Sequence, residues 1–361
     1  MHPAQAGSSR RRPVSCCHNP IHCILPPYIL DRMAESDDPK VRAIAVAAIA
    51  RSASLRATRT TLAQMPAMAA IPSAVGKKER LVYDLKNRGS SFLPGTLVRR
   101  EGGAKSKDPA VNEAYDYSGL TYDFYLKLFN RNSLDDRGMT LISSVHVARK
   151  YNNAFWNGEQ MAYGDGDGVI FTRFTKSIDV VGHELTHGVV THTCNLDYKN
   201  ESGALNEHFA DVFGSLIKQW KKKQTAAKAD WLIGPDIMAP GAKAKALRTF
   251  KDEPAYTGDP YLGDDPQPKH LKDKYTGGDD SGGVHINSGI PNHAFFLVAT
   301  TIGGNAWDKA GRIWYRTMLA LNQKSDFNQM VSMSTQSAAT LFGNNSPEHK
   351  AVIKAWKTVG F

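Results

Sequence analysis

Cysteine is scarce in this chain of 361 residues, and it is unevenly placed. Of the four cysteines, Cys16, Cys17 and Cys23 lie near the N-terminus, while Cys194 stands alone in everything that follows. An odd cluster and one distant thiol make a poor disulfide framework, which excludes a small protein held together by disulfide bonds. With 41% hydrophobic and 22% charged residues, the composition is typical of a globular chain of two or three domains.

Long hydrophobic runs are also missing. The longest, residues 43–50, falls short of the roughly 20 residues that a membrane-spanning helix needs, so we expect no membrane span. The basic N-terminus is not followed by an apolar stretch of about 7 to 15 residues, so no secretory signal peptide is recognisable. We therefore expect a precursor made in the cytoplasm, and any export to the extracellular space would use a route without such a signal.

Acidic residues are the minority charge, and the formal net charge is +10. Residues 1–70 carry nine basic and four acidic side chains, so half of the excess lies in a fifth of the chain. A basic protein that binds nucleic acid or a cell-wall polymer on an inactive enzyme scaffold is one interpretation, and charge is its only support. Because the excess is concentrated in one terminal segment, we expect no nucleic-acid partner.

Three regions differ in their sequence pattern. Residues 1–75 combine a Pro-Pro segment, an alanine-rich helical stretch around 41–50 and a low-complexity run typical of a linker. Residues 76–195 alternate β-type runs with turns, including GVIFTRF at 168–174, and residues 196–361 have mainly helical patterns. The pattern predicts an α+β protein with a β-rich N-terminal lobe, an α-helical C-terminal lobe and a small N-terminal segment. Helices are expected at 110–130, 179–194, 204–220, 288–301, 305–322, 327–342 and 347–357.

One motif carries recognisable chemistry. His183 and His187 belong to an H-E-x-x-H sequence, and residues four apart lie on one face of a helix. Both imidazoles can therefore reach one zinc ion, with Glu184 beside it as a candidate general base. By itself the motif is also compatible with a structural helix that carries two ordinary histidines.

A third zinc ligand is needed, because catalytic zinc usually has three protein ligands and one open position. Glu207 follows His187 after nineteen intervening residues, on a second amphipathic stretch. Asn206 and Asp211 flank it and are residue types that orient zinc-bound histidines by accepting their other N–H. Taken alone, the segment also fits a solvated helix face.

Two glycine-rich segments are less specific. Asp280 precedes His285 by five residues, a pairing that suits a carboxylate-supported imidazole able to stabilise an oxyanion, although a lone histidine in such a loop is often structural. The GDGDG sequence at 164–168 partly mimics a calcium loop, but Lys176 stands where that loop needs a bidentate glutamate. We expect a tight turn there.

These blocks together resemble the thermolysin-like neutral metallopeptidases. The resemblance rests on NNAFWNGEQMAYGDGDG (152–168), IDVVGHELTHGVV (178–190), NESGALNEHFADVFG (200–214) and GGVHINSGIPNHAF (282–295), and it covers about 77–361. The PPYIL segment and the missing signal are similar to the protealysin-like branch, which has a short propeptide. The family implies a two-lobed fold, with the H-E-x-x-H helix joining the lobes.

The resemblance implies a role for each matching residue. It implies that His183, His187 and Glu207 bind one zinc ion and that Glu184 takes a proton from the attacking water. Supporting roles are implied for Tyr198 and His285 as the oxyanion-stabilising pair, Asp280 behind His285, Asp211 behind His183, and Asn206 behind His187.

The same resemblance implies how substrate is bound. Asn153 and Ala154 match the edge segment that pairs with substrate backbone, and Arg248 matches the arginine that binds the carbonyl of the residue after the cut. A hydrophobic pocket is implied at Phe171, Phe174, Val180, Ile233 and Leu247. Such a pocket favours cleavage before bulky apolar residues with broad specificity.

Calcium is where the chain departs from thermolysin. Asp179 and Asp230 remain from the paired-calcium site, but other ligand positions hold Lys218, Leu232, Pro235 and Lys245. Because calcium needs six to eight oxygen ligands, we expect zinc dependence with little or no structural calcium.

The N-terminal segment is expected to be an intramolecular inhibitor. Pro26, Pro27 and Tyr28 lie in a segment whose prolines favour an extended, strand-like plug in the cleft. Cys23 lies three residues before Pro26, so its thiolate could occupy the open position on the zinc ion. An unligated cysteine is the simpler interpretation. Cleavage between about 51 and 75 would release the enzyme.

The sequence thus predicts a zinc endopeptidase that is made as a zymogen and acts on proteins or peptides, as a monomer. The predicted divisions are residues 1–75 as propeptide and linker, 76–195 as the β-rich lobe with the zinc-binding helix, and 196–361 as the helical lobe. A zinc aminopeptidase shares H-E-x-x-H with a distal glutamate, but no motif for a free amino terminus is visible.

Overall fold

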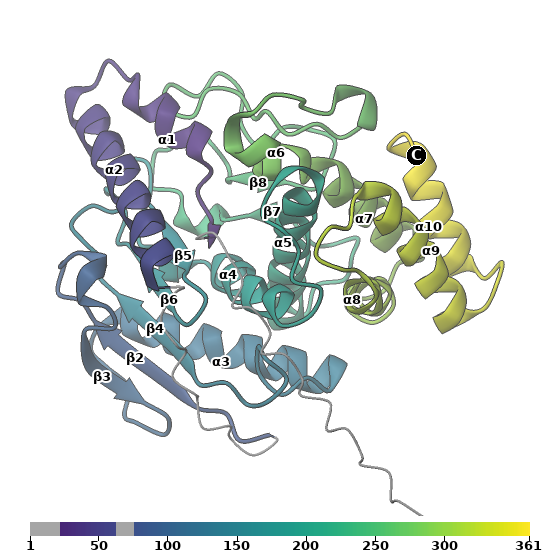
Figure 1. Ribbon diagram of the computed structural model, residues 1–361, viewed down its shortest axis with the longest axis horizontal. Helices are drawn as coiled ribbons and strands as arrows, with labels where there is room; N and C mark the ends of the chain where they lie inside the picture. Colours follow the sequence, from purple (N-terminus) through teal and green to yellow (C-terminus); the bar gives the residue numbers. More distant parts are fainter. Residues whose placement is uncertain (1–21, 63–75) are drawn as a thin grey trace, which may run out of the picture.

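A mixed six-stranded sheet forms the core of the first lobe in the computed structural model, which describes residues 22–62 and 76–361 (Figure 1). Its spatial order is β1-β5-β6-β4-β2-β3, so that β1 and β3 are the edges. β4 runs parallel to β2 and β6, and the other pairs are antiparallel. The strands are β1 (His22–Cys23), β2 (Arg80–Asp84), β3 (Thr96–Arg100), β4 (Leu141–Val145), β5 (Ala154–Trp156) and β6 (Met161–Tyr163).

The helices lie close to their expected positions, and those from α5 onward form the second lobe. The expected segment at 327–342 is a helix with those bounds, and the others differ from their predicted ends by a few residues. The helices are α1 (Pro27–Ala34), α2 (Pro39–Leu62), α3 (Pro109–Phe129), α4 (Ile178–Thr191), α5 (Asn200–Lys222), α6 (Asp279–Asn287), α7 (Gly289–Ile302), α8 (Ala310–Ala320), α9 (Phe327–Phe342) and α10 (Pro347–Thr358). A small hairpin of β7 (Leu232–Ile233) and β8 (Arg248–Thr249) lies between α5 and α6 in sequence.

The central helices α4 and α5 pack closely against each other (Figure 1). Glycine makes this approach possible, because a Cβ atom on Gly214 would lie 2.6 Å from the carbonyl oxygen of Asp179. All of α4 from Ile178 to Val190 is buried, between the sheet on one side and α5 on the other. The fold therefore carries the H-E-x-x-H segment in the interior, at the junction of the two lobes.

The N-terminal segment differs from the expected extended plug. Strand β1 is only His22–Cys23, with one more backbone hydrogen bond at Ile24, whereas the PPYIL sequence starts helix α1, with Pro27 at its first position. Proline fits there, because the first N–H of a helix needs no partner and the fixed φ angle suits a helical turn. Helix α2 then continues to Leu62, into residues expected to be a linker.

A further expectation about local structure was wrong. GVIFTRF is not a strand, because only Phe171 forms an isolated bridge, to Met238, and a short 3-10 turn follows at Phe174–Lys176.

The glycine-rich segment before His285 forms a left-handed turn at the start of α6, in which residues 280–283 all have positive φ. Gly282 and Gly283 allow such a turn at little steric cost.

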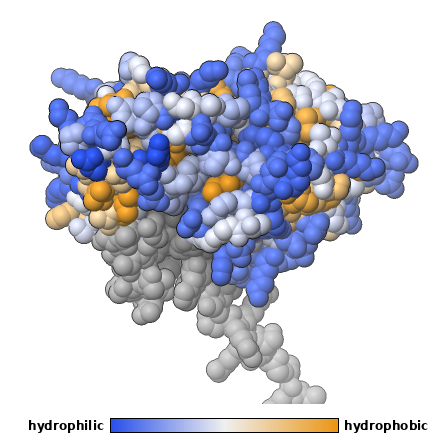
Figure 2. Space-filling view, turned by 90° about the horizontal axis from the view of Figure 1, so that it is seen from above, coloured by the Kyte–Doolittle hydropathy of each residue, from blue (hydrophilic) through white to orange (hydrophobic). Residues whose placement is uncertain are grey.

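The hydrophobic faces of the N-terminal helices are turned inward. Ile29, Leu30 and Met33 of α1 are buried, as are Val41 and Ala45 of α2. Figure 2 shows the molecule from above, with hydrophilic residues over most of this face and hydrophobic ones in small separate patches. No described helix is both long and apolar enough to cross a lipid bilayer.

The turn at 164–168 is held by contacts inside the protein. Asp167 accepts hydrogen bonds from three successive backbone N–H groups, beginning with Val169, and from the side chain of Asn152. Asp165 contacts Nδ1 of His146 at 2.9 Å, and Nε2 of His146 lies 2.7 Å from Asp108. The carboxylates of this turn are therefore occupied by protein partners, as expected for a tight turn.

His146 is expected to make stability depend on pH. The hydrogen bond to Asp165 raises its pKa to about 9 with help from Asp108, although partial burial opposes the charge. Since this pKa is raised above the unfolded value near 6.5, the stabilisation is complete below pH 6.5 and is lost as pH rises to 9. His146→Asn should lose about 1 kcal/mol at pH 6 after solvent screening, and almost nothing at pH 9.5. Urea unfolding at both pH values measures this, and a pH-independent loss would refute the assignment.

Candidate active site

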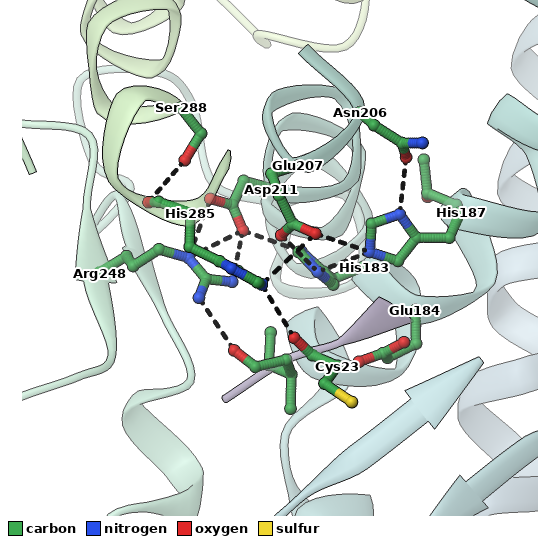
Figure 3. A network of polar contacts seen from close by, with 12 residues as sticks. Cys23, His183, Glu184, His187, Asn206, Glu207, Asp211, Arg248, His285 and Ser288 are labelled. Carbon is green, nitrogen blue, oxygen red and sulfur yellow. Dashed lines mark hydrogen bonds and ion pairs between the residues drawn. The ribbon is translucent and has the colours of Figure 1, made fainter. Parts of the chain in front are cut away.

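Two histidines on α4 converge at the centre of the molecule (Figure 3). The Nε2 atoms of His183 and His187 lie 3.1 Å apart, and both side chains are fully buried. Nδ1 of His183 contacts Asp211 at 2.8 Å, and Nδ1 of His187 contacts Asn206 at 2.8 Å. Each ring is therefore held at its outer nitrogen, which leaves the two Nε2 atoms facing one shared point.

Helix α5 brings a carboxylate to the same point. Glu207 lies 3.4 Å from Nε2 of His183 and 3.5 Å from Nε2 of His187. Its Oε2 atom is buried without a hydrogen-bond partner among the described residues, while Tyr198 donates to Oε1. Two imidazole nitrogens and a carboxylate oxygen are the donor set of a catalytic zinc ion, so these residues fit that metal.

The surroundings of this point act differently on the two histidines and on Glu207. Burial opposes a positive charge on both rings, but Asp211 and Glu207 outweigh it at His183 and raise its pKa to about 9. At His187 burial dominates, and its pKa falls to about 3. Burial also disfavours charge on Glu207, yet the neighbouring histidines, His285 first among them, hold its pKa well below the usual range. Glu207 is therefore a carboxylate, able to neutralise a cation placed beside it.

Glu184 lies next to the two histidines with one oxygen occupied. Its Oε2 accepts the backbone N–H of Trp156 at 2.9 Å, and its Oε1 is buried without a hydrogen-bond partner among the described residues. Burial raises the pKa of Glu184 to about 8, against the lowering effect of His183 and of backbone amides. A carboxylate with one fixed oxygen, one open oxygen and a pKa near neutrality suits proton transfer.

The left-handed turn at the start of α6 aligns a third imidazole, that of His285, with the site. Asp280 accepts from the backbone N–H of His285 at 2.7 Å and contacts its Nδ1 at 2.6 Å. Nε2 of His285 then lies 3.1 Å from the hydroxyl of Tyr198. Burial opposes charge on His285, but Asp280 and Glu207 raise its pKa to about 9. The structure thus brings these three residues together beside Glu207.

Arg248 on β8 shares its carboxylate partner, Asp211, with His183. Its guanidinium donates to Asp211 at 2.8 and 3.0 Å, and the two groups are buried. Asp211 also accepts from Asn292 at 2.9 Å. One buried carboxylate therefore positions His183, Arg248 and Asn292, and sequence reasoning missed Asn292 because no motif marks it.

The N-terminal segment lies along the site as an added strand. β1 pairs with β5 antiparallel, and the N–H of Ile24 continues this pairing to the carbonyl of Ala154 at 3.2 Å. The N–H of Leu25 donates to Oδ1 of Asn153 at 3.1 Å, and the carbonyl of Ile24 accepts from Arg248 at 3.0 Å. The three residues expected to hold substrate backbone thus hold this segment.

Cys23 enters the site through its backbone and not through its thiol. Its carbonyl oxygen lies 3.1 Å from Nε2 of His285. Figure 3 shows the sulfur pointing away from His183 and His187, so the thiolate-ligand alternative does not match the structure. The helical position of Pro27 and Tyr28 likewise places them beyond the extended part, where Tyr28 is close to Tyr256 of the second lobe.

The residues of the expected pocket are all buried, and two of them, Ile233 and Leu247, adjoin Arg248. Ile233 pairs with Arg248 across the β7–β8 hairpin, and Leu247 donates its N–H to the carbonyl of Ile233 at 2.9 Å. The rings of Phe171 and Phe174 lie 5.8 Å apart. With Val180, these side chains have no measurable exposure.

Lys218 lies between Asp179 and Asp230, the two carboxylates that remain from the family's paired-calcium site. The ammonium of Lys218 lies 2.9 Å from Asp179, 2.8 Å from Asp230 and 2.6 Å from the carbonyl oxygen of Leu232. Burial opposes this charge, but the two carboxylates outweigh it and raise the pKa of Lys218. All three ammonium hydrogens have acceptors, so the cluster carries its own cation.

Comparisons with known proteins agree over nearly the whole chain. Residues 73–191 match the family model of the thermolysin metallopeptidase catalytic domain, and residues 194–361 match that of its alpha-helical domain. An extracellular metalloprotease of Pectobacterium carotovorum subsp. carotovorum is 43% identical over 94% of this chain and 96% of its own length. Protease PrtS of Photorhabdus sp. (strain Az29) is 49% identical over 78% of this chain and 76% of its own.

A solved structure is similar over the same extent. The precursor of protealysin, a metalloproteinase from Serratia proteamaculans, superposes with a TM-score of 0.85 at 46% sequence identity. The match covers 94% of this chain and 99% of that one, and so includes the N-terminal segment described here.

Proposed function

Since this chain belongs to the thermolysin family of metallopeptidases and is a zinc metalloendopeptidase, we propose that it cuts before bulky hydrophobic residues with Glu184 as general base. The convergence of His183, His187 and Glu207 beside Glu184 carries the proposal. Residues 1–75 act as propeptide and linker, 76–195 as the lobe with the zinc-binding helix, and 196–361 as the helical lobe. The protein acts as a monomer.

His183, His187 and Glu207 hold the metal. A bound zinc ion supplies positive charge that lowers the pKa of water towards 7 and polarises a peptide carbonyl. Glu184 takes a proton from the attacking water on its open oxygen and gives it to the leaving nitrogen. Because Oε2 of Glu184 is held by the N–H of Trp156, the proton moves at a fixed position.

The remaining residues bind and orient the peptide. Tyr198 and His285 donate hydrogen bonds to the oxygen of the attacked carbonyl. With Asp280 at Nδ1 and a pKa near 9, His285 carries protons on both nitrogens at neutral pH, so Nε2 is a donor. Arg248 binds the next carbonyl, while Asn153 and Ala154 hold the backbone, as they do for the N-terminal segment here.

The N-terminal segment keeps the enzyme inactive, because its own backbone occupies the groups that would bind the backbone of a substrate. Similarity to a protealysin precursor supports this role. Export to the extracellular space, by a route that uses no recognisable signal peptide, is supported by the name of the Pectobacterium relative. Cleavage of the chain between α2 and β2 would release the segment.

Metal removal tests the cofactor. Treating the processed enzyme with 1,10-phenanthroline should abolish casein hydrolysis, and added zinc should restore it. A chelator selective for calcium should leave hydrolysis intact, because Lys218 occupies the acidic cluster. Persistent hydrolysis after complete removal of zinc would contradict the proposal.

A peptide library tests the pocket. Because Phe171, Phe174, Val180, Ile233 and Leu247 are apolar, cleavage sites should be enriched in Leu, Ile and Phe on the C-terminal side of the cut. Each methylene is worth only about 1–3 kcal/mol in such a pocket, so several side chains should be accepted. Mass spectrometry of the products measures the preference, and enrichment of charged residues there would refute the assignment.

A further inference from the structure

A histidine of the N-terminal segment lies directly against the zinc-binding residues. The ring of His22 stacks on His187 with centroids 4.2 Å apart and planes 17° apart, and it meets Tyr198 edge-on at 4.4 Å. His22 is 1% exposed. His22, His187 and Glu207 each offer one ligand atom, and these three atoms lie within 4.8 Å of one another, close enough to hold a metal ion. We propose that His22 is a fourth zinc ligand in the precursor, an inference that rests on the proposed function.

The strand pairing explains why His22, and not Cys23, reaches the metal. In β1, His22 lies opposite Trp156 and Cys23 opposite Phe155. Successive side chains of a strand point to opposite faces, so His22 and Cys23 cannot both face the site. Trp156 is the residue whose N–H binds Glu184, which fixes its partner His22 beside the catalytic groups.

The segment is aligned as a substrate would be. The carbonyl of Cys23 faces His285, and Ile24 lies between Ala154 and Arg248. These contacts place the Cys23–Ile24 peptide bond where the proposed mechanism cuts. Hydrolysis there would add the oxygen of water to the carbonyl carbon of Cys23 and break its bond to the nitrogen of Ile24. Glu184 would carry the proton from water to that nitrogen, leaving a carboxylate and an amine.

His22 explains how a segment in this register persists. Three protein ligands leave a catalytic zinc open to water, whereas four ligands make the closed set of a structural site. In the proposed site His22 joins His187 and Glu207, with which it forms one group, and His183, which contacts both of those residues, so the position needed by water is filled. The side chain of His22 therefore makes the segment an inhibitor, although its backbone is bound as that of a substrate would be.

Cobalt spectroscopy tests the ligand directly. Full-length Glu184→Gln protein, which cannot cut itself, is loaded with Co²⁺, and the visible absorption spectrum is compared with that of the same protein carrying His22→Phe. Phenylalanine keeps an aromatic ring against His187 but has no ligand nitrogen. We expect a changed cobalt spectrum and metal loss to a chelator at least about tenfold faster.

Cys23→Ala is the matched control, because it alters the neighbouring residue on the opposite face of the strand and keeps the carbonyl. It should leave the cobalt spectrum unchanged. Loss of a sulfur-to-cobalt charge-transfer band in this variant would overturn the proposal in favour of a thiolate ligand. Equal spectra and equal chelation rates with and without His22 would also overturn it.

Proteolysis gives an independent readout. With Glu184 present, the His22→Phe precursor should be cut at Cys23–Ile24, and mass spectrometry should find a fragment that ends at Cys23. An uncut chain with an unchanged cobalt spectrum contradicts the role of His22, whereas a processed enzyme without peptidase activity contradicts the proposed function itself. The two failures are therefore distinguishable.

Discussion

Replacing Glu184 by glutamine is expected to lower kcat/KM for a peptide substrate by about 10³-fold or more while zinc stays bound. Glutamine keeps the size of the side chain and an oxygen that accepts the N–H of Trp156, so the position of the group is preserved. What it lacks is the ability to accept a proton from water at the open oxygen. The full-length variant should also stay untrimmed when it is purified alone.

Glu159→Gln is the control for the charge change, because Glu159 is exposed on the same lobe. Both variants and the unmodified protein are processed with the same added protease, since self-processing should fail in one of them. Zinc content is measured by atomic absorption. Retention of more than about a tenth of the activity, with zinc in place, would refute Glu184 as general base.

Replacing Lys218 by methionine is expected to lower the free energy of unfolding by about 3–5 kcal/mol. Methionine fills similar space but leaves Asp179 fully buried without its cation, and Asp230 loses the same partner. The carbonyl oxygen of Leu232 loses a hydrogen-bond donor as well. Denaturant unfolding in the Glu184→Gln background, where autolysis is absent, measures the loss.

Lys228→Met is the matched control. Lys228 is exposed beyond the end of α5, so this substitution should change the free energy of unfolding little. Calcium provides a second measurement on the unmodified protein. Because the ammonium of Lys218 already occupies the space between the two carboxylates, excess calcium should leave Tm unchanged. A rise of many degrees with zinc still bound would contradict the interpretation.

The parts of the site that sequence could predict are those held by local geometry. His183 and His187 lie one helical turn apart, so their common face follows from spacing alone. Glu207 lies on a second helix, so sequence spacing could not place it beside the histidines. Only the nearby Asn206 and Asp211 indicated a metal environment. The roles assigned to Tyr198 and Arg248 came from family resemblance, because their approach to the site depends on the packing of α5 and the β7–β8 hairpin.

The errors came from segments where tertiary contacts decide the backbone. The Pro-Pro sequence was interpreted as extended, yet Pro27 is at the first position of a helix, which proline equally favours. In GVIFTRF, apolar and β-branched residues suggested a strand, but Phe171 and Phe174 pack into the core beside a turn. His22 was overlooked because nothing in its neighbourhood marks a ligand until β1 pairs with β5.

Strand β1 belongs to the same chain as the cleft it occupies. The proposed inhibition therefore depends on the effective concentration of this segment near the cleft. A covalently attached segment acts at an effective concentration on the order of millimolar when its tether is short, so even weak binding closes the site. One cut between α2 and β2 turns β1 into a separate molecule, whose binding then depends on dilution. We therefore expect the nicked enzyme to stay closed in a concentrated solution and to open when it is diluted into a large volume. Activity that rises on serial dilution of freshly nicked protein is the measurable mark of this arrangement.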